Sequence, residues 1–256
     1  MKIKFHYTYY ILAISFVLCG RFSNLIVLTS IVIFHELGHF VVSLINHFEV
    51  DKIIIYSYGG ITKLNIKINT KIIAELTVSL GGIFFQLVYY VFIYMLYKIG
   101  YVREYIYNMF VIYNKSILFF NLLPIIPLDG YKIMSLVLYY FLPYKVVNKI
   151  ALLISFFLIF ILSLINYNTG NYSFLLVLSV IMYYTFKYSK DMKYLFNQFL
   201  LERYLYKFDY KRVSCIRKID YIYKERRHII GEKGQFLTEK AFLNGKFKVN
   251  IKKMFD

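Results

Sequence analysis

The sequence predicts an all-α polytopic membrane protein with about six transmembrane helices, a small β-hairpin between the second and third helices, and a short cytoplasmic C-terminal domain. Three observations predict this class. Hydrophobic residues make up 59% of the 256 residues, more than a soluble domain of this size needs. Most of them are gathered into segments of membrane-spanning length. Basic residues are concentrated in the segments between and after these stretches, as in membrane proteins.

Six apolar segments can be drawn along the chain, and each is a candidate spanning helix. They cover Tyr7–Cys19, Leu25–Ile45, Ile72–Tyr97, Tyr105–Ile126, Val146–Ile165 and Tyr172–Tyr188. The first has the shape of a signal peptide, but Leu18 before Cys19 is too large for a lipoprotein cleavage site. We therefore expect it to remain as the first helix. An uncharged loop around Gly170 is expected between the last two segments.

A β-hairpin is expected between the second and third segments, where two β-branched runs flank Gly59-Gly60. Lys63 and Asn65 alternate with apolar neighbours, so one face of the second strand is apolar. Two interpretations stay open. The hairpin is either a small cytoplasmic element without a role, or the strand Ile61–Ile68 is an edge beside a catalytic site onto which an extended peptide adds.

The charge is strongly positive, with 31 Lys and Arg against 14 Asp and Glu, and 18 of these basic residues lie in the segment 187–256. In a soluble chain this would indicate nucleic-acid binding. In an apolar chain it is typical of cytoplasmic segments beside anionic lipid, and we expect no nucleic-acid partner. The distribution of basic residues along the chain also places both termini in the cytoplasm. The two cysteines offer no disulfide framework.

The motif His35-Glu36-Leu37-Gly38-His39 lies in the middle of the second apolar segment. On a helix the two histidines are four residues apart, so their rings project from one face. Two neutral imidazoles in this relation can bind one zinc ion, and Glu36 is placed to deprotonate a bound water. The alternative, a chance match on a soluble surface helix, is disfavoured because ionisable residues within a spanning helix indicate a functional site.

A third zinc ligand is expected because catalytic zinc usually takes three protein ligands and leaves one position for water. The best candidate is Asp129, which follows two helix-breaking prolines, Pro124 and Pro127, at the cytoplasmic end of the fourth segment. The orientation of the second segment places the histidines at a similar depth. An ordinary Pro-Leu-Asp-Gly turn is the alternative interpretation.

The two motifs together resemble the site-2 protease family of intramembrane zinc metalloproteases, and within it the stage IV sporulation protein FB group. The resemblance implies zinc (Zn²⁺) ligands, a general base, and an amide that holds the substrate or the developing oxyanion. These are His35, His39 and Asp129 as ligands, Glu36 as base, and Asn121 as the amide. One departure is Gln86, which stands where the family commonly has Asn, in a segment that lacks the family's proline.

The resemblance also implies how the chain is divided. Residues 1–190 form the membrane-embedded metalloprotease domain, and residues 191–256 form a basic cytoplasmic extension. The extension is interpreted as a truncated or degenerate regulatory domain, because it is short for a full pair of the nucleotide-sensing CBS modules found in the group.

The implied function is intramembrane cleavage of a membrane-associated protein, a pro-sigma factor during sporulation. The implied location is the bacterial cell membrane, as a multi-pass protein of the mother-cell membrane around the forespore. The expected partners are the lipid bilayer, the protein substrate and inhibitory membrane proteins. Two other classes stay open: a membrane zinc transporter that uses the same ligands, and a non-catalytic membrane binding protein.

Overall fold

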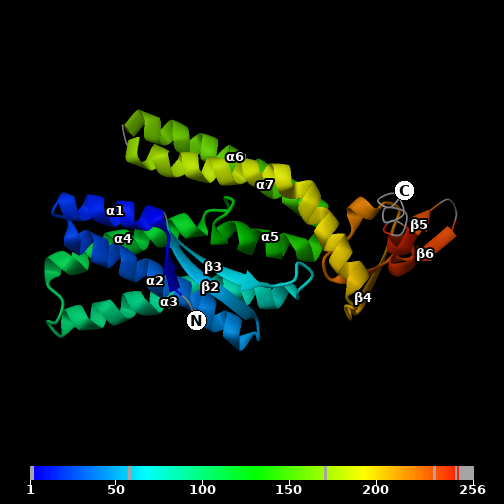
Figure 1. Ribbon diagram of the computed structural model, residues 1–256, viewed down its shortest axis with the longest axis horizontal. Helices are drawn as coiled ribbons and strands as arrows, with labels where there is room; N and C mark the ends of the chain where they lie inside the picture. Colours follow the sequence, from blue (N-terminus) through cyan, green and yellow to red (C-terminus); the bar gives the residue numbers. More distant parts are fainter. Residues whose placement is uncertain (1–2, 57–58, 170–171, 233–234, 246, 248–256) are drawn as a thin grey trace. The chain divides into compact units, whose positions relative to one another are not determined.

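The structure is a computed structural model that describes residues 3–56, 59–169, 172–232, 235–245 and 247 (Figure 1). The chain divides into two compact units, which are described in turn. The elements in chain order are β1 (Ile3–Phe5), α1 (Tyr7–Leu18), α2 (Phe22–Ile45), β2 (Glu49–Tyr56), β3 (Gly59–Asn65), α3 (Ile72–Lys98), α4 (Glu104–Leu122), α5 (Asp129–Phe141), α6 (Tyr144–Thr169), α7 (Tyr172–Leu205), β4 (Arg212–Ile216), a 3-10 turn (Ile219–Tyr221), β5 (Arg226–Glu232) and β6 (Gln235–Thr238).

The chain is mostly helical, and every one of the six apolar segments falls on a helix. Three helices of the described residues are long and apolar enough to cross a membrane: Phe22–Ile45, Ile72–Lys98 and Tyr144–Tyr167. The apolar helix α1 has only 12 residues. The six spans and the cytoplasmic location of the termini therefore stay predictions. The expected loop at Gly170 lies outside the described residues.

Three details differ from the sequence prediction. The prediction gives one β-hairpin as the only β-structure, whereas the described residues form two three-stranded sheets, one of them at the C-terminal end. The fourth helix ends at Leu122 rather than Ile126, because Pro124 disfavours a helical conformation in the residue before it. Asp129 begins a further helix, α5, which was missed because its 13 residues are too few for a membrane span.

The first unit contains a sheet in the order β1-β2-β3, which packs against α2 (Figure 1). Strand β1 runs parallel to β2, and β2 pairs antiparallel with β3, with Ile54 opposite Ile61. The two residues that join β2 and β3, 57 and 58, lie outside the described part. Since β1 and β3 pair only with β2, β3 is an edge strand of the sheet as described.

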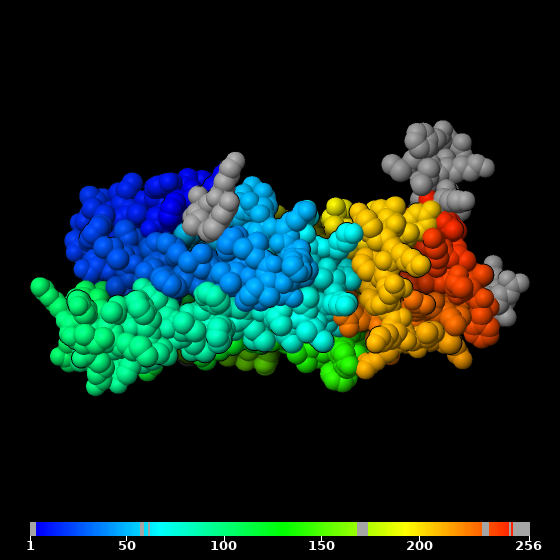
Figure 2. Space-filling model, turned by 90° about the horizontal axis from the view of Figure 1, so that it is seen from below, coloured from blue at the N-terminus to red at the C-terminus, as the bar shows by residue number. Residues whose placement is uncertain are grey.

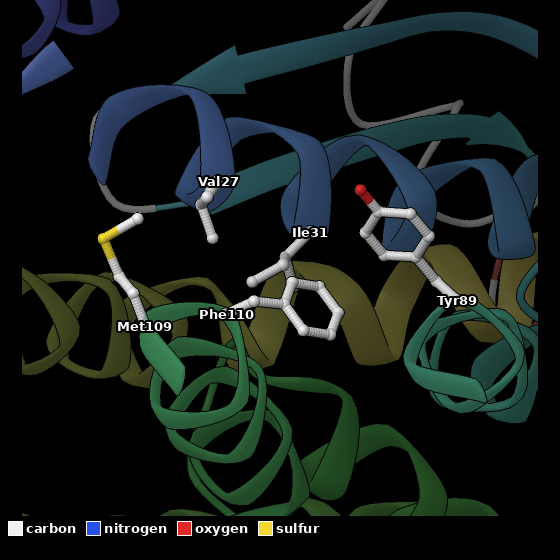
Figure 3. Close-up of a cluster of buried hydrophobic side chains, with 5 residues drawn as sticks. All are labelled: Val27, Ile31, Tyr89, Met109 and Phe110. Atoms are coloured by element: carbon white, nitrogen blue, oxygen red, sulfur yellow. The ribbon is translucent and has the colours of Figure 1, made fainter. Parts of the chain in front are cut away.

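The core of the first unit lies between α2, α3 and α4 (Figure 3). Figure 3 shows Ile31 of α2 and Phe110 of α4 pointing toward one another. Tyr89 of α3 stacks on Phe34 with ring centroids 3.9 Å apart. In a bilayer, lipid is as apolar as these side chains, so it is close packing rather than escape from water that holds such helices together.

Helices α2 and α3 approach one another through glycines. A Cβ atom at Gly38 of α2 would lie 2.3 Å from the carbonyl oxygen of Gly81 in α3, closer than atoms can pack. Small residues at such a crossing let two helix backbones come close. This contact brings the backbone of α3 within hydrogen-bond reach of side chains on α2.

The second unit contains α5 from Tyr131 onward, α6, α7 and the C-terminal lobe, which we define as the described residues between 206 and 245. Helices α6 and α7 pack on one another. In the lobe, β4 and β5 are parallel and β5 and β6 are antiparallel. Figure 2 shows the end of α7 and these strands, coloured yellow to red, gathered together. The domain boundary at residue 190 stays a prediction, and α7 runs through it without a break.

A buried charge network ties the end of α7 to the lobe. Arg203 pairs with the Glu239 carboxylate through both Nε and Nη2, and it donates to the carbonyl oxygen of Lys224 at 3.0 Å. His228 donates from Nδ1 to Glu239 (3.1 Å), and its Nε2 accepts from the backbone N–H of Tyr223 (3.0 Å). This arrangement uses the neutral imidazole, because a proton on Nε2 would face the Tyr223 N–H.

The network makes the stability of the lobe sensitive to acid. Burial lowers the pKa of His228, against the opposing effect of its hydrogen bond with Glu239. Burial by itself would raise the pKa of Glu239, but hydrogen bonds from His228 and Arg203 outweigh it and lower the pKa to about 2. Both folded-state values lie below the ordinary ones. Each group therefore contributes its full stability to the folded lobe only above its ordinary pKa. As the pH falls, the lobe loses stability first through His228 and then, at lower pH, through Glu239.

We expect the melting temperature of the detergent-solubilised chain to fall between about pH 7.5 and about pH 5.5, as His228 is forced to take up a proton. His228→Asn keeps a neutral donor but does not titrate. Its melting temperature should be lower at the upper pH and should change less over this range. A variant with the same pH slope as the wild type would contradict this assignment.

Candidate metal centre

Three electron-pair donors converge inside the first unit. His35 and His39 project from adjacent turns of α2, and Asp129 is the first residue of α5. The Asp129 Oδ2 atom lies 3.0 Å from His35 Nε2 and 2.9 Å from His39 Nε2, and the two Nε2 atoms are 3.2 Å apart. All three side chains are buried. The residues named as ligands from sequence thus lie together, as the helical spacing of the histidines predicts.

The tautomers of both histidines are set by their second ring nitrogens. His35 Nδ1 lies 3.1 Å from the Gln86 side-chain oxygen, and His39 Nδ1 lies 2.8 Å from the Val78 carbonyl oxygen. A carbonyl oxygen can only accept, so each Nδ1 carries the proton and donates it. In the neutral ring, each Nε2 then presents a lone pair toward the Asp129 carboxylate.

This donor set fits a zinc ion. Tetrahedral ligands about 2.0–2.1 Å from zinc lie about 3.3 Å from one another, close to the spacing of these three atoms. Two imidazoles and one carboxylate leave a fourth position, as catalytic zinc requires. Gly82 keeps the space beside them clear, since a Cβ there would lie 2.4 Å from His39 Nε2. Three lone pairs at this spacing repel one another unless a cation or a proton lies between them.

Glu36 lies near the two histidines but has a hydrogen-bond partner of its own. The ligand atoms of His35, Glu36 and His39 lie within 4.8 Å of one another, so Glu36 is a second carboxylate at the same place. Its Oε2 accepts a hydrogen bond of 2.7 Å from Thr62 Oγ1 of β3. Because one Asp129 oxygen lies within 3.0 Å of both histidine nitrogens, we propose Asp129 as the third ligand and leave Glu36 for proton transfer.

Gln86 of α3 and Asn114 of α4 support His35 from behind. The Gln86 amide nitrogen donates to the backbone carbonyl of Asn114 (3.0 Å) and to its side-chain oxygen (3.1 Å). These two acceptors fix which end of the Gln86 amide faces His35. Both ends of that amide are thus engaged within the protein, and Gln86 is wholly buried.

Known proteins are similar to this chain in sequence and in fold. No family model matches the chain. The chain is 28% identical over 212 residues to stage IV sporulation protein FB of Bacillus subtilis. The alignment covers 80% of this chain and 72% of that protein. Its fold is similar to that of a site-2 protease from Methanocaldococcus jannaschii, with a TM-score of 0.59 and 21% identity over 73% of this chain and 91% of the other.

The relative in sequence has the name of the group, and the neighbour in fold the name of the family, that the two motifs resemble. The resemblance indicated by the two motifs is thus confirmed by a relative in sequence and a neighbour in fold. The ligand set itself rests on the convergence of three side chains within this chain.

Two polar residues of α4 differ in how well the sequence anticipates them. Asn121 lies half-buried in the last turn of α4, and within the described residues it has no hydrogen bond with the three ligands or Glu36. Its role toward substrate stays a prediction. Asn114 was missed, although a buried amide inside an apolar helix is a signal that could have found it.

Proposed function

We propose that the chain is an intramembrane zinc endopeptidase that cleaves a membrane-associated protein. The observation that supports this most directly is the convergence of His35, His39 and Asp129, with Glu36 alongside, on a helix apolar enough to cross a membrane. The likeness to site-2 proteases in sequence and fold supports the same reaction class.

In this mechanism each side chain has one task. Zinc, when bound by the two Nε2 atoms and Oδ2, would supply Lewis-acid polarisation of the scissile carbonyl and of water. Glu36 takes the water's proton at Oε1, because Oε2 is occupied by Thr62, and later gives it to the leaving amine. Asn121 would donate from its amide to the substrate carbonyl oxygen. The Gln86 and Val78 oxygens keep the two imidazoles in the required orientation.

A helical substrate must unwind before cleavage, because its carbonyl groups are otherwise held in internal hydrogen bonds. The edge of β3 would accept such an unwound segment by strand addition. The substrate that we propose is a pro-sigma factor of a sporulating bacterium, on the basis of the similarity to a stage IV sporulation protein. The location would be the mother-cell membrane, with both termini cytoplasmic and with inhibitory membrane proteins as further partners.

The test is co-expression of the chain with a bacterial pro-sigma factor, followed by a blot for the processed form. Wild type should cleave it, and Glu36→Gln should reduce cleavage by about 100-fold or more while zinc content is unchanged. Glu49→Gln, an exposed carboxylate on β2, is the matched control and should cleave like the wild type. If Glu36→Gln cleaves normally, the mechanism is wrong. If wild type and Glu36→Gln both fail to cleave but carry zinc across the membrane equally, the transporter is favoured.

A further inference from the structure

Strand β3 contacts the Glu36 side chain at two positions on one face, Gly60 and Thr62. The Thr62 hydroxyl donates to Glu36 Oε2 at 2.7 Å. Gly60 lies directly against the same side chain, since a Cβ there would be 2.2 Å from Glu36 Cγ and 2.7 Å from Oε1. Residues two apart on a strand point to the same side, so the strand holds this carboxylate between a hydroxyl and a bare backbone.

The contact matters because Glu36 is only 5% exposed. A buried carboxylate that loses a hydrogen-bond donor is left with an unmet desolvation penalty. Without the Thr62 hydroxyl, the Glu36 carboxylate could also rotate about its side-chain bonds, because Gly60 only packs against it and does not form a hydrogen bond with it. The hydroxyl therefore selects one rotamer, in which Oε2 accepts the hydrogen bond from Thr62, while Oε1, which lies beside the strand at Gly60, accepts no hydrogen bond within the described residues.

We propose that Thr62 is a positioning residue for the general base. This rests on the proposed function of Glu36. The Thr62 hydroxyl holds Oε2, so that Oε1 is the oxygen that takes and returns the proton during cleavage. Misplacement of a reacting group by a fraction of an ångström to one ångström is enough to lower a rate strongly. In the part of the chain that the structure describes, the Thr62 hydroxyl bonds only to Glu36, so its effect on the reaction would pass through that side chain.

The experiment compares Thr62→Val, which keeps the shape and removes the hydroxyl, with Thr62→Ser, which keeps the hydroxyl. Each is made in the full chain in detergent and assayed for kcat, KM and zinc content on the cleaved substrate. Thr62→Val should lower kcat roughly tenfold to a hundredfold, with KM within about twofold and zinc content unchanged. Thr62→Ser should restore most of the rate. Thr77→Val, at an exposed threonine of α3, is the matched control and should have no effect.

A second readout does not depend on cleavage. The melting temperature is measured for Thr62→Val, for Glu36→Ala and for the double variant. If Thr62 acts through Glu36, the loss caused by Thr62→Val should largely disappear in the Glu36→Ala background. Additive losses would overturn the proposal, as would an unchanged kcat, a raised KM alone or lost zinc. If Glu36→Gln itself cleaves normally, the proposed protease mechanism fails, and the melting cycle still decides whether Thr62 holds Glu36.

Discussion

Asp129→Asn is expected to lower the affinity for zinc by roughly a hundredfold or more, beyond the loss typical of residues that only orient a ligand. The amide keeps the size and shape of the side chain but removes the charge that attracts the cation, and its oxygen is a weaker donor than a carboxylate. Zinc is measured in the purified chain by competition with a chromogenic chelator. Asp51→Asn, on the exposed face of β2, is the matched control and should bind as the wild type does.

This experiment separates two possible ligand sets. Asp129 and Glu36 both lie near the two histidine nitrogens, and only one of them is needed as the third ligand. If Asp129→Asn loses zinc and Glu36→Gln keeps it, Asp129 is the ligand. The opposite pattern would make Glu36 the ligand and would remove the general base from the mechanism.

Gln86→Leu is expected to lower zinc affinity about tenfold to a hundredfold and to destabilise the fold by about 1–3 kcal/mol. The leucine fills similar space but removes the acceptor of His35 Nδ1 and the donor to Asn114, all of them buried. The measurements are chelator competition and thermal melting of the same preparation.

Asn114→Leu is the companion variant for Gln86→Leu. It removes the side-chain acceptor of Gln86 but leaves the backbone carbonyl at 3.0 Å, so Gln86 keeps one anchor. Its effect on zinc should be the smaller of the two. If Gln86→Leu binds zinc normally, the His35 tautomer does not depend on Gln86.

The meeting of the three proposed metal ligands could be predicted from sequence because each depends on a short local pattern. The histidines are four residues apart on one helix, and Asp129 follows a pair of prolines that end another. Thr62 could not be predicted in this way. It lies 26 residues from Glu36, and only the pairing of β3 and the packing of α2 on the sheet bring the two together.

The same reasoning explains what was missed in the fold. Apolar length identifies helices that could cross a membrane, but it does not detect α5, whose 13 residues are too short. The C-terminal sheet was missed because its strands are brief and rich in charge, so periodicity gives little signal there. The buried Arg203–Glu239 pair, which a surface-charge interpretation of the tail would not anticipate, holds that region to α7.

The two histidines differ in whether a mutation can remove the hydrogen-bond acceptor of their Nδ1 atom. His35 depends on a side chain, so its basicity and orientation can be tuned by exchanging Gln86. His39 depends on the main-chain carbonyl of Val78, which every amino acid at that position would still provide. A scan of single substitutions would therefore detect the Nδ1 acceptor of His35 but not that of His39, although both rings donate a hydrogen bond to the protein. Differences in metal affinity among related proteins should accordingly come from the residue that accepts the His35 hydrogen bond rather than from the one that accepts the His39 hydrogen bond.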